Sequence, residues 1–405
     1  MRVLLQSYGS RGDVEPLVAL AVHLRELGAE VRMCAPPDEE FAALLAGTGV
    51  EQVAFGESVR ELVTGGGGPA KAPQVAAALV DDWFDTVLPA AEGAGALLAT
   101  GLMPAGGPSV AELLDLPYVC ALFQSRVLPS PDHEPLGRPG KPFPPGADIP
   151  TMWRVDAEKA DDLYAAPLNR RRAAHGLPPV TNVRDHVITD HPWLATDPIL
   201  DPMERTPGLD VSQTGAWFRP DSRPLSDALM AFLDAGTPPV YVGFGSMPMH
   251  ASTDVAPAAV KELRARGRRV IVARGWAGLA LVAEQGDQPD CFVVGDVNHQ
   301  ALFPRVAAVV HHGGAGTTTT AARAGTPQVV VPQMADQPYW GARVTELGIG
   351  ATAPTASSLP EALEIALRPE TRSRATHVAG SIRVDGASVA ARMVFSLANR
   401  SEVLA

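Results

Sequence analysis

Short apolar runs recur along the chain, and each is followed by a segment in which apolar residues return every three or four positions. Val3–Gln6 is such a run, and Glu15–Leu27 after it has the spacing of a helix that ends at Gly28. Alternating strands and helices predict a parallel sheet with helices on both faces. The further strands that the pattern predicts are Glu30–Cys34, Ala96–Leu98, Tyr118–Phe123, Val240–Phe244, Val270–Ala273, Cys291–Val294, Val306–Val310 and Gln328–Val331.

This alternation occurs twice, on either side of a proline-punctuated connector that contains one helical segment. We therefore expect an α/β fold of two Rossmann-like, doubly wound parallel-sheet domains that face each other across a deep cleft. Ligands bind beyond the carboxyl ends of the strands in such sheets, so the cleft would hold the site. The expected divisions are residues 1–214 for the N-terminal domain, 215–238 for the linker, 239–385 for the C-terminal domain and 386–405 for a last helix that packs back towards the N-terminal domain.

Composition narrows the class of protein. The 405 residues are 46% hydrophobic and 19% charged, with a formal net charge of −12, which offers no basic surface for a nucleic-acid backbone. The cysteines at 34, 120 and 291 are too far apart for a disulfide framework or a zinc site. No apolar run approaches the ~20 residues of a membrane helix, and the polar turn after the first strand argues against a signal peptide. We expect a cytoplasmic enzyme without stable membrane insertion.

The sequence His-His-Gly-Gly-Ala-Gly-Thr-Thr at 311–318 follows an apolar run and precedes a helix start. Glycines let a backbone approach a ligand closely, and the first amides of a helix carry partial positive charge without a partner inside the helix. Phosphate binds readily at such a place, and His312 at the rim can donate a further hydrogen bond. A tight turn without a ligand is the alternative that the glycines alone leave open.

Two further strand ends in the second half carry polar groups. Ser246 follows the run Val240–Phe244, where its hydroxyl can reach a phosphate oxygen, although a plain turn is the commoner role of such a segment. Asp336 and Gln337 follow Gln328–Val331, and a carboxylate beside an amide offers both acceptors and donors to sugar hydroxyls. A simple turn is again the alternative.

The first strand is followed by a polar loop, Gly-Ser-Arg-Gly-Asp at 9–13, and then by a helix. Asp13 in this loop can cap the helix, which is the commoner role for an Asp at such a position. It can also serve as a general base towards a ligand beyond the strand end, because a base must lie within hydrogen-bond reach of the proton it takes. The residues alone leave both roles open.

Several motifs are missing. No Gly-x-Gly-x-x-Gly follows the first strand, and no Gly-x₄-Gly-Lys-Ser/Thr occurs, which argues against a dinucleotide oxidoreductase and a P-loop ATPase. No Asp-x-Asp is present to hold a metal-bound nucleotide, and no Gly-x-Ser-x-Gly supports a hydrolase.

Together, these motifs resemble those of the GT-B nucleotide-sugar glycosyltransferases, most closely the enzymes that decorate vancomycin- and teicoplanin-type glycopeptide antibiotics. The resemblance covers essentially the whole chain, and either one family member or two sister enzymes joined in the linker would account for it. The stretches that carry it are Ser10–Pro16, Gly245–Ser246, His311–Thr317 and Asp336–Gln337, with support from Glu30–Asp38, Thr189–Trp193 and Asp296–Gln300.

The resemblance implies an inverting, metal-independent transfer in which Asp13 deprotonates an acceptor hydroxyl. It implies no cofactor, because a nucleotide sugar is the co-substrate and UDP or TDP is the product. Asp336 and Gln337 would bind the donor sugar. The residues implied to bind the donor diphosphate are Ser10, Arg11, Ser246, His312, Gly314, Gly316 and Thr317, and those implied to bind the nucleotide base are Arg274, Trp276, Val297 and His299.

The Asp336–Gln337 pair favours UDP-glucose or UDP-N-acetylglucosamine as donor, because a trideoxy sugar would leave these polar groups unpaired. A TDP-deoxyaminosugar of the vancosamine type is the alternative. The acceptor, a glycopeptide aglycone, is expected on the first domain, against the loops Val63–Pro73 and Leu128–Trp153, with the enzyme acting as a monomer. Another natural-product acceptor, a sugar-nucleotide epimerase and a pure nucleotide-binding module are the remaining alternatives.

Overall fold

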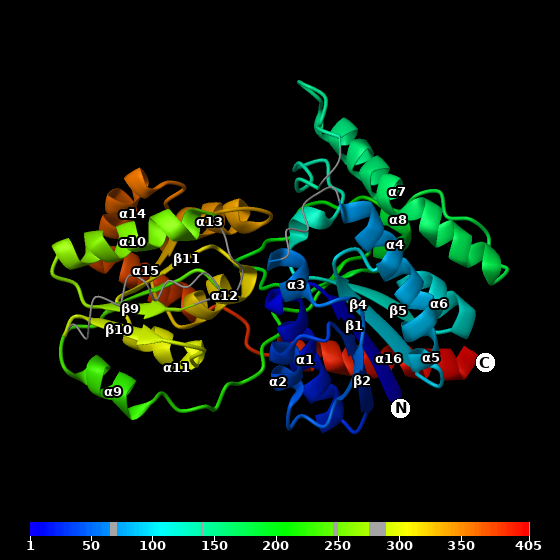
Figure 1. The fold of residues 1–405 in the computed structure, drawn as a ribbon, viewed down its shortest axis with the longest axis horizontal. Helices are drawn as coiled ribbons and strands as arrows, with labels where there is room; N and C mark the ends of the chain where they lie inside the picture. Colours follow the sequence, from blue (N-terminus) through cyan, green and yellow to red (C-terminus); the bar gives the residue numbers. More distant parts are fainter. Residues whose placement is uncertain (65–70, 139–140, 246–249, 275–288, 405) are drawn as a thin grey trace. The chain divides into compact units, whose positions relative to one another are not determined.

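The structure, a computed structural model, describes the backbone of residues 1–64, 71–138, 141–245, 250–274 and 289–404, and their side chains except those of 250–254 and 399–404. The chain forms two compact units, each built around one parallel sheet (Figure 1). Unit 1 consists of Met1–Pro198, Pro202–Arg219 and Arg383–Ala405, and unit 2 consists of Ile199–Asp201 and Pro220–Ile382.

The sheet of unit 1 has seven parallel strands in the order β3-β2-β1-β4-β5-β6-β7. An interior strand of this sheet, β1 (Arg2–Tyr8), is apolar from Val3 to Leu5 because helices cover both faces. Val3 and Leu5 pack on one face, and Leu4 and Tyr8 pack on the other. The other strands are β2 (Glu30–Ala35), β3 (Glu51–Ala54), β4 (Ala96–Gly101), β5 (Tyr118–Leu122), β6 (Trp193–Leu194) and β7 (Ser212–Gln213).

Helices α1, α2 and α16 cover the first of these faces, and the remaining helices of unit 1 cover the second. The last helix, α16, lies beside α1 and buries Ala387, Ala390 and Val394. The helices are α1 (Arg11–Glu26), α2 (Glu39–Leu45), α3 (Val59–Thr64), α4 (Ala72–Asp82), α5 (Leu88–Ala91), α6 (Gly107–Leu114), α7 (Ile149–Ala174), α8 (Val183–Ile188) and α16 (Gly386–Leu404), with a π-helical turn at Trp83–Val87 and a 3₁₀ turn at Ser125–Val127.

The sheet of unit 2 has six parallel strands in the order β10-β9-β8-β11-β12-β13. Helices α10 and α14 cover one face, and the others pack on the opposite face. The strands are β8 (Val240–Gly243), β9 (Val270–Ala273), β10 (Cys291–Val294), β11 (Ala308–His311), β12 (Gln328–Val330) and β13 (Gly350–Thr352). The helices are α9 (Asp227–Asp234), α10 (His250–Ala265), α11 (His299–Leu302), α12 (Ala315–Arg323), α13 (Gln337–Glu346), α14 (Leu359–Ala366) and α15 (Pro369–Ala379), with 3₁₀ turns at Phe303–Arg305 and Ala356–Ser358.

Two doubly wound parallel α/β units confirm the predicted fold class. Every predicted strand is present, and the structure adds the short or half-polar strands β3, β6, β7 and β13. Helix α1 begins four residues earlier than predicted, at Arg11, because Ser10 caps it. The predicted domain limits and the cleft stay predictions. Among the described residues, no helix has the length and hydropathy that a membrane span requires.

In each sheet there are two adjacent strands whose following helices pack on opposite faces of the sheet. In unit 1 these strands are β1 and β4, and in unit 2 they are β8 and β11, because α1 and α6 cover different faces, as do α10 and α12. A crevice at the carboxyl ends of such strands is where doubly wound folds bind ligands. The turn at 311–318 and the loop at 9–13 both lie at such an end.

Candidate active site

The turn between β11 and α12 requires its glycines. Gly313 has a φ of +93°, and a Cβ on it would lie 2.7 Å from Val330 Cγ1. A Cβ on Gly314 would lie 2.6 Å from His312 Nε2. Larger residues would therefore strain the backbone or displace the neighbouring side chains. The glycines bring the main chain close to the position where a ligand would meet the helix.

The N-terminus of α12 carries no side-chain cap, since its N-cap residue is Gly314. Three threonine hydroxyls in the first turns donate back to the helix carbonyls, from Thr318 to Gly314 O (3.0 Å), from Thr319 to Ala315 O (2.8 Å) and from Thr320 to Gly316 O (2.8 Å). These hydroxyls therefore leave the amides at the helix start uncapped. Such amides form an anion site when a ligand approaches.

The His312 ring lies close to Gly314 of this turn and to Gly245, which follows β8. A Cβ on Gly245 would lie 2.9 Å from His312 Cε1, and one on Gly314 would lie 2.6 Å from His312 Nε2. Burial lowers the pKa of His312 to about 4, so the imidazole is neutral at pH 7. Its Nδ1 is buried and has no hydrogen-bond partner among the described residues. A buried polar atom without a partner requires an explanation, and a bound ligand provides one.

A buried polar chain supports the turn from beneath. His311 Nδ1 accepts a hydrogen bond from the Gly313 amide (3.1 Å), so Nε2 carries the proton and donates it to Gln328 Oε1 (2.9 Å). The Gln328 side chain in turn donates to Thr318 O (3.2 Å). Burial lowers the pKa of His311 to about 3, which keeps the ring neutral. No role for His311 or Gln328 was predicted from the sequence, although a Gln within an apolar strand was a usable signal.

The predicted sugar-binding pair holds its own loop in shape. Gln337 Oε1 accepts hydrogen bonds from the amides of Gln333 (2.8 Å) and Met334 (3.1 Å), and Asp336 Oδ2 accepts one from Trp340 Nε1 (2.7 Å). Burial raises the pKa of Asp336. The contacts leave the Gln337 NH₂ group and the second Asp336 oxygen as the atoms that can meet a ligand.

A segment from far upstream anchors the helix that follows this loop. The carbonyls of Ile199 and Leu200 each accept a hydrogen bond from the Arg343 guanidinium, at 3.0 Å, and Asp201 accepts one from the Tyr339 hydroxyl. Leu200 is buried in the same cluster as Trp340. The segment therefore belongs to unit 2, although it precedes the connector in sequence. No local pattern predicts this contact.

Of the predicted nucleotide-base residues, Val297 and His299 lie at the start of α11, and Arg274 directly follows β9. His299 Nε2 is 2.9 Å from the Tyr241 hydroxyl, and the His299 ring stacks on Phe303 at a centroid distance of 4.6 Å. Val297 is half-buried, whereas the Arg274 side chain is exposed. One face and one nitrogen of His299 are thus occupied by the protein.

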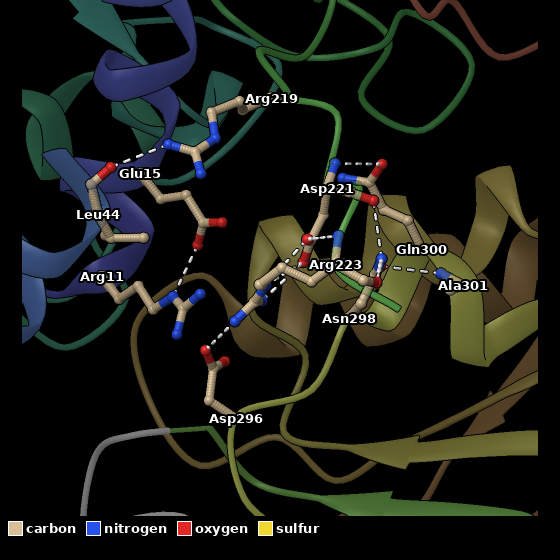
Figure 2. Close-up of polar contacts among 10 residues, drawn as sticks. All are labelled: Arg11, Glu15, Leu44, Arg219, Asp221, Arg223, Asp296, Asn298, Gln300 and Ala301. Carbon is tan, nitrogen blue, oxygen red and sulfur yellow. Dashed lines mark hydrogen bonds and ion pairs between the residues drawn. The ribbon is translucent and has the colours of Figure 1, made fainter. Parts of the chain in front are cut away.

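The connector holds the loop that carries Val297 and His299 (Figure 2). The Asn298 NH₂ group donates to the carbonyls of Asp221 and Arg223, both at 2.8 Å. The Arg223 guanidinium pairs with Asp221 at 2.7 Å and with Asp296 at 2.6 Å. This cluster was not predicted from the sequence, because it joins two short segments that lie more than 70 residues apart.

In unit 1, Asp13 occupies the N-terminus of its own helix. Its Oδ2 accepts hydrogen bonds from the Ser10 amide (2.8 Å) and the Ser10 hydroxyl (3.2 Å), while Ser10 Oγ accepts one from the Gly12 amide (3.2 Å). Arg11 pairs with Glu15 at 2.8 Å (Figure 2). The structure therefore shows the cap, and a catalytic role for Asp13 stays a prediction.

Two of the predicted site residues, Ser246 and Trp276, lie outside the described residues, as does part of the loop Val63–Pro73. The structure places Ser10, Arg11 and Asp13 in unit 1 and the other described site residues in unit 2. Within the described part of the chain, no group of three or more His, Cys, Asp or Glu side chains converges as a metal site would. The roles of all these residues stay predictions.

Curated relatives match nearly the whole chain. It is 52% identical to glycosyltransferase GtfE of Amycolatopsis orientalis over 98% of this chain and 97% of that protein. It is 51% identical to vancomycin aglycone glucosyltransferase of the same organism over 99% of both chains, and 48% identical to its dTDP-epi-vancosaminyltransferase over 93% of both. The family model for the C-terminal domain of erythromycin biosynthesis protein CIII-like proteins matches residues 282–394.

Solved structures share the fold at low sequence identity. Glycosyltransferase SnogD of Streptomyces nogalater has a TM-score of 0.68 and 24% identity, covering 98% of this chain and 99% of that chain. Glycosyltransferase VinC, solved in complex with dTDP, has a TM-score of 0.70 and 21% identity, covering 99% and 100%. Both matches run through the two units, so the fold of the chain is that of two-domain glycosyltransferases.

Proposed function

The chain belongs to the family of glycopeptide antibiotic glycosyltransferases, and we propose that it transfers a hexose from a UDP-sugar to a hydroxyl of a glycopeptide aglycone. The transfer inverts the anomeric carbon and uses no metal. The observation that carries the proposal is the buried His312 Nδ1, which lacks a partner, beside the uncapped N-terminus of α12. An anionic diphosphate satisfies both features at once.

The turn between β11 and α12 stabilises the leaving group in this proposal. As the anomeric bond breaks, its electron pair moves to the diphosphate oxygen, and negative charge grows there. The amides of Gly316 and Thr317, together with the His312 ring, supply donors whose positions are fixed before the reaction starts. Such preorganised donors are typically the largest single contribution to catalysis of group transfer. They take the part that a metal ion plays in other sugar transferases.

Asp13 is the proposed general base. The acceptor oxygen forms a bond to the anomeric carbon on the face opposite the diphosphate, and its proton passes to the Asp13 carboxylate. The transition state resembles an oxocarbenium ion, as in other glycosyl transfers. The hydrogen bonds from Ser10 fix one carboxylate oxygen, which orients the group. In the same proposal, Ser10 and Arg11 contact the donor diphosphate, and Ser246 adds a hydroxyl to it.

The donor proposal rests on the loop before α13. The Gln337 NH₂ group and the second oxygen of Asp336 are the atoms of this pair that remain for a sugar, since the protein uses the others. A donor and an acceptor side by side match a hydroxylated ring, and a trideoxy sugar would leave them unpaired. UDP-glucose or UDP-N-acetylglucosamine is therefore the proposed donor. His299, Val297, Arg274 and Trp276 are the proposed contacts to its base.

The acceptor proposal draws on the relatives. One relative is named a vancomycin aglycone glucosyltransferase and spans 99% of this chain, so a glycopeptide aglycone is the proposed acceptor. It would lie on unit 1, near the segments Val63–Pro73 and Leu128–Trp153. All proposed site residues come from one chain, so we propose an active monomer. Because the proposed donor is a nucleotide sugar, we propose that the reaction takes place in the cytoplasm.

Competition between donors tests the proposal. Vancomycin aglycone is incubated with UDP-glucose, UDP-N-acetylglucosamine or a dTDP-linked trideoxy aminosugar, each with and without EDTA, and products are analysed by mass spectrometry and NMR. We expect turnover with a UDP-hexose, a β-linked product from the α-linked donor, and no effect of EDTA. Preference for the dTDP sugar would overturn the donor assignment, and loss of activity in EDTA would overturn the metal-independent route.

A further inference from the structure

A cavity of about 470 Å³ lies in unit 1, and its lining residues have no role in the transfer described so far. The end of β1, the loop after β3, and helices α3 and α4 (labelled in Figure 1) provide its walls. Its lining includes Tyr8, the carboxylates of Glu57, Glu61 and Asp82, and the ammonium group of Lys71. The cavity and the candidate base come from the same strand end, because Tyr8 closes β1 and Asp13 follows five residues later.

Tyr8 provides a rigid polar group in this cavity. The residue is 1% exposed, and its hydroxyl makes no hydrogen bond with any described residue. Its ring packs edge-on against Phe55 at a centroid distance of 6.0 Å. Gly56 has a φ of +71°, and a Cβ there would lie 2.3 Å from the Tyr8 ring, so only glycine keeps this wall open. Tyr8 therefore lines the cavity with a hydroxyl that has no partner among the described residues, and a ligand can complete its hydrogen bonds.

The charges around Tyr8 are predominantly negative. Three acidic residues, Glu57, Glu61 and Asp82, and one lysine, Lys71, are in the lining. Burial and the nearby carboxylates of Glu57, Asp38 and Asp82 raise the pKa of Tyr8 to about 12. Burial also raises the pKa of Asp82, and Glu57 adds to that effect. The negative potential in the cavity therefore favours a cation.

Asp38 does not supply this site, because α3 uses its carboxylate. Asp38 accepts hydrogen bonds from the Ser58 hydroxyl (2.7 Å) and from the amides of Val59 (3.0 Å) and Arg60 (3.1 Å). It therefore fixes the start of α3 and, with it, the position of Glu57 on the preceding loop. The other carboxylates of the lining are those of Glu57, Glu61 and Asp82, and the Asp82 carboxylate also accepts a hydrogen bond from the Gly56 amide.

We propose that this cavity binds a protonated amine carried by the acceptor. This amine site rests on the proposed function, and it specifies the chemical class of one group that the acceptor carries. An ammonium ion offers three N–H donors, and Tyr8 Oη with the carboxylates of Asp82 and Glu57 offers the matching acceptors. Binding of the amine anchors the acceptor on the unit that carries Asp13. The amine thereby contributes to acceptor affinity and takes no part in the chemical step.

Calorimetric titration with vancomycin aglycone and with its N-acetylated form tests the proposal, because acetylation converts the protonated amine into a neutral amide. The variants are Asp82→Asn and Glu57→Gln, with Glu39→Gln as a control for an exposed carboxylate on α2, outside the cavity. We expect the wild-type protein to bind the aglycone with the free amine about tenfold more tightly than the N-acetylated form. In both cavity variants, this ratio of affinities should fall close to one. The control variant retains the wild-type ratio.

Equal affinity for the two forms in wild type would overturn the proposal, and so would an unchanged ratio in both cavity variants. Glu57→Gln keeps the test decisive if Asp82→Asn does not fold, because the Glu57 side chain is exposed. Because the titration is carried out without a nucleotide sugar, it measures acceptor binding whether or not the protein catalyses the transfer. Failure of the proposed transfer would appear as absent product with every donor, whereas failure of this inference would appear as a ratio near one.

Discussion

The N-termini of helices α1 and α12 differ in charge when their N-cap residues and first three helical residues are compared. In α1 these positions are Ser10-Arg11-Gly12-Asp13, and in α12 they are Gly314-Ala315-Gly316-Thr317. Both helices have glycine at the third of the four positions. In α1 the chain supplies its own anion at the fourth position, where the Asp13 carboxylate accepts from Ser10 at 2.8 Å. In α12 the fourth position is a neutral threonine and the first has no side chain.

The difference shows how one kind of helix start serves two purposes. The N-terminus of α1 is satisfied from within the chain, and the cap fixes the carboxylate of the candidate base. The N-terminus of α12 is left to an anion from outside, with the unpaired His312 Nδ1 beside it. Changes at these positions should therefore affect catalysis and donor binding separately.

The largest expected effect comes from Asp13→Asn. The amide oxygen of Asn can still accept the hydrogen bonds from Ser10, but the side chain can no longer take a proton. We expect kcat to fall roughly 10²- to 10⁴-fold, the range for loss of a general base, with UDP affinity unchanged. Steady-state kinetics and calorimetry measure the two quantities. Near-normal kcat would show that Asp13 is only a cap.

His312→Gln probes the open helix start. We expect kcat to fall by about 10²-fold, because one donor to the leaving diphosphate is lost, while the α1 cap and acceptor KM stay as in wild type. His23→Gln, on an exposed part of α1, is the matched control. An equal fall of kcat in both variants would contradict a role of His312 in stabilising the leaving diphosphate.

Gln328→Leu tests the polar chain under the same turn. It leaves the His311 Nε2 proton unsatisfied, which costs about 1–3 kcal/mol of stability. Because the chain fixes Gly313 and α12, we expect donor KM to rise about fivefold to tenfold while acceptor KM stays constant. Thermal unfolding and steady-state kinetics with each substrate varied measure both effects. A parallel rise in both KM values would indicate general loosening of the fold.

The smallest effect is a pH dependence of UDP binding. Burial lowers the pKa of unliganded His312 to about 4, and a bound diphosphate favours the protonated ring, so binding raises that pKa. His312 therefore takes up a proton when UDP binds at a pH below the pKa of the UDP-bound state. As the pH falls below that pKa, the affinity for UDP rises, and it levels off near the pKa of the unliganded state. Calorimetry at a series of pH values should show this pH dependence of UDP affinity in the wild-type protein and not in His312→Gln. Identical profiles would contradict it.

Much of the fold followed from the apolar runs, since strands such as β8 and β11 are buried on both faces and have almost no polar residues. Strands β3 and β13 were missed because they are short or half-polar. The turn at 311–318 was predictable because its glycines act locally. Contacts between distant segments, such as Gln328 with His311 or Asn298 with Arg223, were not, because no local periodicity encodes them.

The most direct test gives α12 the anion that α1 already has. Thr317→Asp places a carboxylate at the position that corresponds to Asp13, and Thr317→Val removes only the hydroxyl. We predict that Thr317→Asp leaves the melting temperature unchanged or higher, because an acidic residue there favours the helix, yet weakens UDP binding by at least ~100-fold. Thr317→Val should weaken it less than tenfold. Equal UDP affinity in the two variants would contradict an open, anion-binding helix start.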